Sequence, residues 1–136
     1  MNIYKIEHSK EEEAKAKHKL FSEYDRIKVM TVADNTIELL EEPCISIRIY
    51  KADQIQILID IMEKYNMTYT LNDVTSEYIS NTTNFNNFLD QYPDQKDDIK
   101  LFMINCMTID DVLDKINEFG IESLNEVDKV ILESIN

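Results

Sequence analysis

Residues 44–75 contain two short stretches in which hydrophobic and polar residues alternate, separated by a stretch with the spacing of a helix. Hydrophobic side chains occupy every second position over residues 45–49 and again over residues 67–71. Between these stretches they recur every three or four positions, at Ile55, Leu58, Ile59, Met62 and Tyr65. Alternation is typical of a strand, and the longer period is typical of an amphipathic helix. The pattern therefore predicts a strand, a helix and a second strand, with Asp53 as the helix N-cap and Asn66 at its end.

The chain before this unit predicts a strand, a helix and then further strand structure. Residues 2–7 are rich in Ile and Tyr and are typical of a strand. Residues 9–24 begin with a capping-box pattern and carry a thin hydrophobic stripe, as in a helix with one solvated face. Residues 26–32 are predicted to form a second strand. For residues 36–40 the pattern leaves two alternatives, a hairpin arm or one helical turn.

The order of these elements predicts the fold class. Residues 2–75 run strand, helix, strand, strand, helix, strand, which is the signature of a ferredoxin-like fold. We therefore predict an α+β protein with a ferredoxin-like domain over residues 1–80, in which both helices cover one face of a four-stranded antiparallel sheet. The isoleucines of residues 45–49 are expected to face the helices, and Arg48 and Tyr50 the open side of the sheet. That open side could bind a ligand, but we expect the C-terminal helices to cover it.

The rest of the chain predicts a helical extension over residues 81–136. Residues 73–84 are polar and are interpreted as a linker. Hydrophobic residues then recur at helical spacing in four segments, 85–92, 94–106, 108–119 and 125–135. Capping or helix-ending residues stand at their boundaries: Pro93, Thr108, Gly120 and Asn125. Gly120 is the only glycine in the sequence, and its place directly after a helix fits the left-handed residue that commonly closes one.

The end of the chain carries a local resemblance. The run IDDVLDKI at residues 109–116, the run GIESL at residues 120–124, and then Glu126 and Leu132, resemble a small helical-hairpin tail. That tail is found at the cytoplasmic C-terminus of some bacterial rhomboid-family membrane proteins. The resemblance covers residues 109–136 and implies a helical hairpin and a bacterial or phage source. It implies no activity, because no catalytic residue of the family lies in the tail.

The charge of the chain restricts its partners. Asp and Glu number 27 against 14 Lys and Arg, which gives a formal net charge of −13. Residues 81–136 hold 12 of the acidic side chains and only 4 of the basic ones. Contacts with nucleic acid normally need cations to neutralise phosphates, so we expect no direct nucleic-acid binding. The same charge attracts partners with basic surfaces.

Other features of the sequence predict the cellular environment. No stretch approaches the roughly 20 hydrophobic residues that are needed to span a bilayer, so we expect no membrane insertion. Residues 1–5 have no hydrophobic core of signal-peptide length. The two cysteines, Cys44 and Cys106, lie far apart and outside any motif, as is usual for reduced thiols. We therefore expect a cytoplasmic protein.

The sequence shows no catalytic motif, metal motif or phosphate-binding loop, so we expect neither an enzyme nor a bound cofactor. A group of acidic residues could gather around a divalent cation: Asp97, Asp98, Asp110, Asp111 and Asp114. Most of them lie in predicted first helical turns, where acids are expected in any case, and no calcium-binding loop is present. We therefore predict no metal site and interpret these residues as an acidic interaction surface.

The predicted helix over residues 53–65 carries two hydrophobic residues beside its main stripe, Ile57 and Ile61. A helix that is hydrophobic over more than one face needs a second contact, either with the C-terminal part or with another chain. We therefore predict a non-catalytic protein–protein interaction module, an adaptor or regulator, that acts through Ile57, Ile61 and the acidic helices. Its partner is expected to be another protein or a second copy of the chain.

Two further hypotheses remain open. The acidic extension could belong to a phage-encoded inhibitor that occupies the nucleic-acid groove of a host protein, because spaced carboxylates can take the place of phosphates. Alternatively, the sheet face that carries Arg48 and Tyr50 could bind a small ligand in a sensor domain. The second hypothesis rests on the fold class alone.

Overall fold

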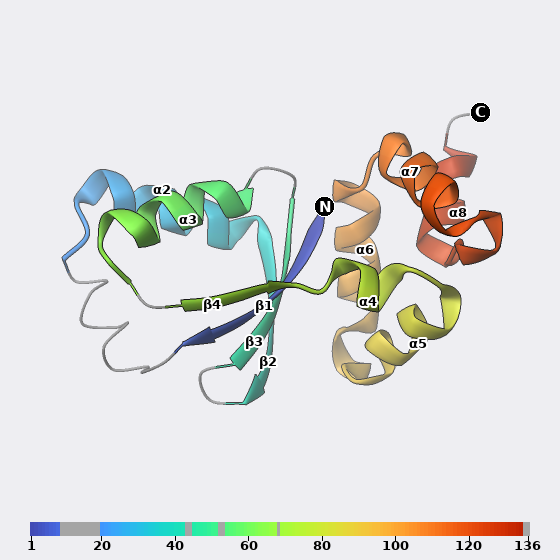
Figure 1. Cartoon of the computed structure of the whole chain (residues 1–136), viewed down its shortest axis with the longest axis horizontal. Coiled ribbons are helices and arrows are strands. Elements are labelled where there is room, and N and C mark those ends of the chain that lie inside the picture. The colour runs from blue at the N-terminus through green and yellow to red at the C-terminus, as the bar shows by residue number, and fades with distance from the viewer. Residues whose placement is uncertain (9–19, 43–44, 52–53, 68, 135–136) are drawn as a thin grey trace. The chain divides into compact units, whose positions relative to one another are not determined.

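The structure is a computed structural model that describes residues 1–8, 20–42, 45–51, 54–67 and 69–134 (Figure 1). The chain divides into two units, Asn2–Asp73 and Val74–Asn136, and Met1 groups with the second. We call them the N-terminal unit and the C-terminal unit. The division lies at Asp73, whereas the sequence pattern predicted a boundary near residue 80. Among the described residues, no helix combines the length and the hydrophobicity that crossing a membrane would require.

The N-terminal unit is a sheet of four antiparallel strands with helices on one face. In chain order its elements are β1 (Asn2–His8), α2 (Glu23–Asp34), β2 (Thr36–Glu42), β3 (Ile45–Tyr50), α3 (Gln54–Lys64) and β4 (Tyr69–Asp73). The strands lie in the order β2-β3-β1-β4, and every neighbouring pair is antiparallel. The prediction of an α+β protein with a four-stranded antiparallel sheet is therefore confirmed.

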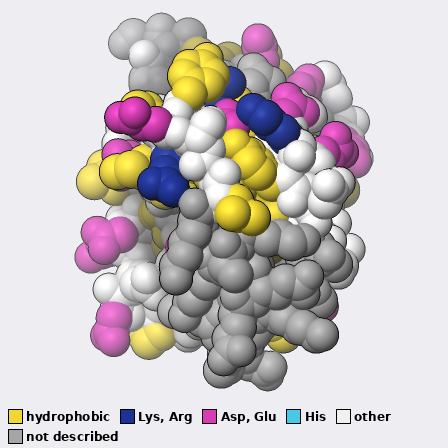
Figure 2. Space-filling view, turned by 90° about the vertical axis from the view of Figure 1, so that its left-hand side faces the viewer, with side chains coloured by type: hydrophobic (Ala, Val, Ile, Leu, Met, Phe, Trp, Pro, Cys, Tyr) yellow, Lys and Arg dark blue, Asp and Glu magenta, His cyan; other side chains and the backbone are white. Residues whose placement is uncertain are grey.

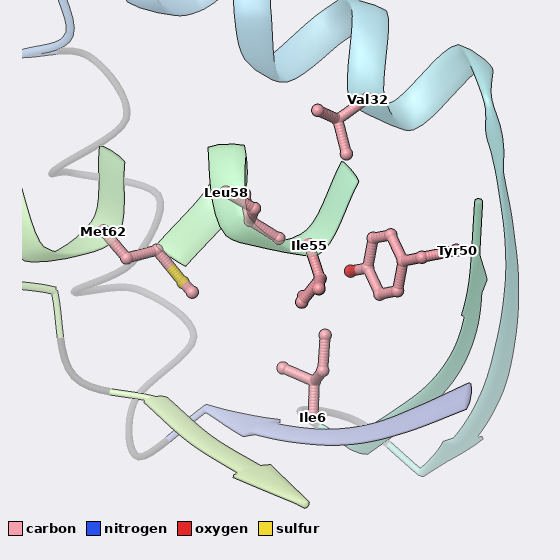
Figure 3. Packing of buried hydrophobic residues seen from close by; sticks show 6 residues of the cluster. All are labelled: Ile6, Val32, Tyr50, Ile55, Leu58 and Met62. Carbon is pink, nitrogen blue, oxygen red and sulfur yellow. The ribbon is translucent and has the colours of Figure 1, made fainter. Parts of the chain in front are cut away.

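A hydrophobic core lies between the two helices and the sheet. Figure 3 shows Val32 of α2 and three residues of α3 pointing towards Ile6 of β1 and Tyr50 of β3. The α3 residues are Ile55, Leu58 and Met62. Because both helices contribute to this one core, both cover the same face of the sheet, as predicted.

The predicted strand over residues 26–32 is wrong, because these residues belong to α2. The helix begins after Ser22, whose side-chain oxygen accepts the backbone N–H of Asp25 at 3.1 Å. This cap and the burial of Val32 outweigh the local preference of the segment for a strand. The predicted helix over residues 9–24 lies for the most part outside the described residues, and only its last two residues belong to α2.

Residues 36–40, for which two alternatives were open, form most of strand β2. This strand pairs with β3 through Thr36 and Tyr50, Ile37 and Ile49, and the pairs that follow, with an irregularity between Leu40 and Glu42. The predicted end of α3 is confirmed. Asn66 has a φ of +54°, and the Met67 amide donates to the Met62 carbonyl at 2.9 Å.

The prediction of which sheet face meets the helices is reversed. Tyr50 lies in the core under α2 and α3, and Arg48 shares its face because residues two apart along a strand point to the same side. Ile47 and Ile49 therefore point to the opposite face, where both are fully buried. The alternation over β3 correctly predicted a strand. Both of its faces carry large side chains that are at least partly hydrophobic, so the pattern did not identify which face the helices cover.

The C-terminal unit is helical. Its helices are α4 (Thr75–Ile79), α5 (Thr82–Asp90), α6 (Lys96–Cys106), α7 (Ile109–Phe119) and α8 (Glu126–Glu133), with 3-10 turns η1 (Pro93–Gln95) and η2 (Ile121–Ser123). The predicted linker over residues 73–84 is wrong in its structure, because it contains α4 and the start of α5. Tyr78 of α4 stacks on Phe88 of α5 with ring centres 4.7 Å apart, which explains how this polar segment becomes helical.

The predicted caps of the last two helices are confirmed. Thr108 and Asp111 form a reciprocal capping box at the start of α7, and the Asn125 side chain accepts two backbone N–H groups at the start of α8. Gly120 follows α7 with φ +87° and ψ 163°, a conformation that residues with a Cβ rarely adopt. Together α7, η2 and α8 make two helices joined by a short turn.

A candidate interaction groove between two helices

The helices α2 and α3 are joined by a group of polar contacts at one end. The Lys64 ammonium group donates to the Asp25 carboxylate at 2.8 Å, and the Tyr65 hydroxyl donates to the same Oδ2 atom at 2.6 Å. The Tyr65 oxygen in turn accepts the backbone N–H of Ser22 at 2.9 Å. These contacts hold the first turn of α2 against the last turn of α3. We call Ser22, Asp25, Lys64 and Tyr65 the staple.

The staple places a buried carboxylate among donors. Asp25 is nearly inaccessible to solvent. The pKa of Asp25 is lowered from 3.8 to about 2. The largest cause is the hydrogen bond that Lys64 donates to the carboxylate, and the next is the hydrogen bond from Tyr65. Burial acts in the opposite direction and is outweighed. Asp25 is therefore held in its charged form, and its role is to orient α2 on α3.

The other end of α2 is also fastened. The Thr36 hydroxyl donates to the Val32 carbonyl at 2.6 Å, and the Asn35 amide group donates to the Thr31 carbonyl at 2.9 Å. Lys51, which precedes α3, donates to the Asn35 side-chain oxygen at 3.3 Å. Since the end of α2 lies near the start of α3, and the start of α2 near the end of α3, the two helices run antiparallel.

A groove with a volume of about 350 Å³ lies between α2 and α3. Its hydrophobic lining comes from Ile27 and Val32 on α2 and from Ile57 and Ile61 on α3. Charged side chains, Lys28 and Asp60, also line it. A mostly hydrophobic concavity of this size is at the lower end of the range of binding sites in proteins.

A row of exposed hydrophobic side chains runs along α2 beside the groove. Tyr24, Ile27 and Met30 are spaced three residues apart, so they are neighbours on the helix surface, and they are 67%, 56% and 64% exposed. We call these three residues the exposed row. Figure 2 views the end of the molecule where α2 begins and α3 ends, and hydrophobic side chains reach the surface there among charged side chains of both signs. Single exposed hydrophobic residues are ordinary, but a row that borders a hydrophobic groove indicates a binding surface.

The predicted interaction residues Ile57 and Ile61 both line this groove. Ile61 is only 4% exposed, and Ile57 is half-buried against the core. The packing of α2 on α3 thus supplies part of the second contact that the sequence analysis assigned to the C-terminal part or to another chain. The α2 side of the groove was missed, because residues 26–32 were interpreted as a strand. The spacing of Tyr24, Ile27 and Met30 after a Ser22 cap is the signal that would have found it.

Arg48 and Tyr50 do not lie on an open sheet face. They lie beside a cavity of about 70 Å³ between α2 and the sheet. The Arg48 Nε atom is 3.6 Å from a Glu38 carboxylate oxygen, and its Nη1 atom is 3.5 Å from the Tyr50 hydroxyl. Burial raises the pKa of Tyr50. The geometry therefore gives Arg48 an acidic neighbour under α2 and removes the open surface on which the small-ligand hypothesis was based.

The predicted acidic residues all lie in the C-terminal unit. Asp97 and Asp98 are exposed in the first turn of α6, where the positive end of the helix dipole stabilises their negative charge. Asp110 and Asp114 are exposed on α7, and Asp111 is half-buried and accepts the Thr108 backbone N–H at 2.9 Å. Across the part of the chain that the structure describes, no three Asp, Glu, His or Cys side chains converge as metal ligands.

One buried charge pair in this unit was not predicted. Lys115 of α7 donates to Asp128 of α8 at 2.6 Å, and the two side chains are 5% and 0% exposed. The same Asp128 oxygen accepts the Asn125 backbone N–H at 2.9 Å. The pair therefore joins α7 to α8 and supports the cap of α8. In the sequence Lys115 follows three acidic residues of a predicted amphipathic helix, so nothing in the pattern indicated that it is buried.

Neither the protein-family models, nor the curated proteins, nor the solved structures include a match to this chain. No function is therefore transferred from a relative, and the resemblance of residues 109–136 to the rhomboid-family tail stays a prediction. The candidate site rests on the geometry of the groove, the exposed row and the staple.

Proposed function

We propose that the protein is a non-catalytic protein–protein interaction module, an adaptor or regulator, whose N-terminal unit docks a partner on the α2–α3 groove. We further propose that this unit is a ferredoxin-like domain. Its element order, β1-α2-β2-β3-α3-β4, and its strand order, β2-β3-β1-β4, support that assignment.

The observation that carries the proposal is the exposed row, Tyr24, Ile27 and Met30, beside the hydrophobic groove. Removing one large hydrophobic side chain from water contributes about 1.5–3 kcal/mol when it becomes fully buried. Three such side chains together provide the few buried anchors that usually dominate a protein interface. The groove provides the concave surface into which a partner's own anchor can insert.

A pair of matched variants tests the proposal. Ile27→Glu places a charge at the edge of the groove, whereas Leu101→Glu makes the same change on α6 at a residue that is 59% exposed. Both variants and the wild type are used as baits in quantitative capture from bacterial lysate, followed by cross-linking mass spectrometry. A partner that the wild type and Leu101→Glu retain, that Ile27→Glu loses, and that cross-links to Lys28 supports the proposal. Equal capture by all three baits contradicts it.

A second candidate function, the acidic inhibitor, is favoured by the exposed carboxylates Asp97, Asp98, Asp110 and Asp114 in the C-terminal unit. Charge-dominated binding weakens steeply as salt rises, because the ions screen exposed charges. Binding that buries hydrophobic side chains in a groove depends less on salt. Washing the same captures at stepped salt therefore separates the two functions: a partner released at moderate salt and unaffected by Ile27→Glu belongs to the acidic surface.

A further inference from the structure

The groove also indicates what kind of partner it takes. Resting on the proposed function, we infer that the occupant is an amphipathic α-helix of another protein, which carries Lys or Arg beside its hydrophobic stripe. The shape of the groove argues for a helix, and the charges around it argue for basic residues and against a second copy of this chain.

The shape follows from the two helices that form the groove. They run antiparallel and are held together by the staple at one end and by the Lys51–Asn35 contact near the other. A groove between two packed helices is the surface along which a third helix commonly lies, with its side chains between theirs. The groove is lined over residues 54–61 of α3, which extend over about 12 Å, so about eight residues of a partner helix lie in it.

The volume of the groove limits what enters it. A space of about 350 Å³ accommodates a few side chains rather than a folded surface. Its lining by Val32, Ile57 and Ile61 suits hydrophobic anchors, which an amphipathic helix presents at positions i, i+4 and i+7. The exposed row on α2 then covers the flank of the docked helix.

The charges on α2 and α3 are the second argument. Asp and Glu outnumber Lys and Arg by five to three on these two helices. Lys64 and Asp25 pair with each other, so the other charged side chains of the two helices are four acids and two cations. The Lys28 ammonium group lies 4.4 Å from the centre of the Tyr24 ring. The exposed Asp60, which lines the groove, accepts a hydrogen bond from Gln56 at 2.8 Å. Of the two charged residues that line the groove, Lys28 lies over the Tyr24 ring and Asp60 is exposed, so Asp60 can pair with a partner's Lys or Arg.

The net charge decides between a basic helix and a second copy. Each copy carries −13, so two copies repel each other over distances comparable to the Debye length, about 8 Å at physiological salt. A basic helix is attracted by the same field and associates faster. Charge thus disfavours self-association and favours a positively charged occupant.

Two synthetic peptides test this inference on the full chain. Both are roughly 15 residues long, with Leu at i, i+4, i+7 and i+11, and they differ only in having Lys or Glu at the flanking positions. They are titrated into ¹⁵N-labelled protein, and amide shifts of α2 and α3 are followed. We expect the Lys peptide to shift these amides with a Kd at least about tenfold below that of the Glu peptide. We also expect Asp60→Lys to reduce that ratio, Ile27→Glu to abolish the shifts, and Leu101→Glu to leave them unchanged.

Two kinds of result overturn the inference and leave the proposed function standing. The first is equal binding of the two peptides, or tighter binding of the Glu peptide. The second is a doubling of mass with concentration in light scattering that Ile27→Glu abolishes, because the occupant is then a second copy. A third result overturns both the inference and the proposed function: neither peptide shifts α2 or α3, the protein stays monomeric, and Ile27→Glu captures the same proteins as the wild type.

Discussion

Lys64 and Asp25 lie 39 residues apart in the chain, and their side chains meet at 2.8 Å where the last turn of α3 reaches the first turn of α2. Tyr65 donates to the same carboxylate oxygen, so one buried acid receives two donors from the end of α3. This contact fixes the position of α2, on which the exposed row stands. The proposed interaction surface therefore depends on a polar contact that lies outside it.

The staple makes stability depend on pH. The folded-state pKa of Asp25, about 2, lies below its unfolded value near 3.9, so the contacts stabilise the fold above about pH 4 and this stabilisation is lost as the pH falls towards 2. We expect the difference in free energy of unfolding between wild type and Asp25→Asn to be largest above pH 4 and to shrink towards pH 2. Urea unfolding at several pH values measures it. Asp34→Asn, at the exposed far end of α2, is the control, and a constant difference for Asp25→Asn would contradict the prediction.

Removing the Tyr65 hydroxyl from the staple should lower the free energy of unfolding. Tyr65→Phe deletes the donor to Asp25 and the acceptor for the Ser22 N–H, while the ring contact with Phe21, with centres 4.4 Å apart, is retained. We expect a loss of about 1–3 kcal/mol in the free energy of unfolding, because Asp25 stays buried with one donor fewer. Tyr24→Phe changes an exposed tyrosine of α2 and should stay within about 0.5 kcal/mol of wild type. Similar losses in both variants would argue against the staple.

The buried pair in the C-terminal unit gives a second stability test. Lys115→Met leaves Asp128 buried without its cation, and we expect a destabilisation of about 3–5 kcal/mol. The double variant Lys115→Met with Asp128→Asn removes the uncompensated charge and keeps an acceptor for the Asn125 N–H, so it should recover part of that loss. Lys129→Met, on the exposed side of α8, is the matched control. If the double variant is less stable than Lys115→Met alone, the uncompensated charge is not the cause.

Gly120 tests backbone conformation without side-chain packing. A Cβ added there would meet no atom within 4 Å, so Gly120→Ala introduces no clash and only forces a side chain into φ +87°. We expect the free energy of unfolding to fall by about 1–3 kcal/mol. Asn117→Ala, at an exposed position of α7, should be neutral or slightly stabilising, since alanine is the better helix former. Calorimetry of both variants gives the comparison, and a neutral Gly120→Ala would exclude strain at this turn.

Two isoleucines that line the groove should respond differently to a charged substitution, because one is exposed and the other is buried. Ile27→Glu changes an exposed side chain and should leave the free energy of unfolding within about 0.5 kcal/mol of wild type. Ile61→Glu places a carboxylate where the side chain is 4% exposed, and we expect it to unfold the N-terminal unit or to destabilise it by several kcal/mol. Circular dichroism melting curves of the two variants distinguish these outcomes. Equal destabilisation would mean that Ile27 is also buried in solution.

The sequence was most informative where local pattern and tertiary structure agree. The strand, helix and strand over residues 45–73 were predicted because each has a clear period and β3 and α3 contribute to one core. The caps Thr108, Asn125 and Gly120 were predicted because a cap depends on its nearest neighbours.

The sequence was least informative where distant contacts decide the structure. Helix α2 was predicted as a strand although the Ser22 cap is a local helix signal. Its position on α3 depends on the contact of Asp25 with Lys64 and Tyr65, which no local window contains. The sheet face was reversed for a related reason: alternation over β3 separates Ile47 and Ile49 from Tyr50 but carries no information about where α2 lies. The α3 side of the candidate site was predicted, because Ile57 and Ile61 lie beside the main hydrophobic stripe of that helix. The α2 side was missed, because residues 26–32 were not predicted to be helical.

Helix α2 is held to its neighbours at both ends, by the staple at Asp25 and by the hydrogen bond from Lys51 to Asn35 at its other end. A helix held in this way loses little further conformational freedom when something docks on it, so the exposed row is preorganised for binding. Most of the entropy lost on association then falls on the partner. A flexible segment that folds into a helix on this surface would bind more weakly than the contact area suggests, and it would also be released quickly.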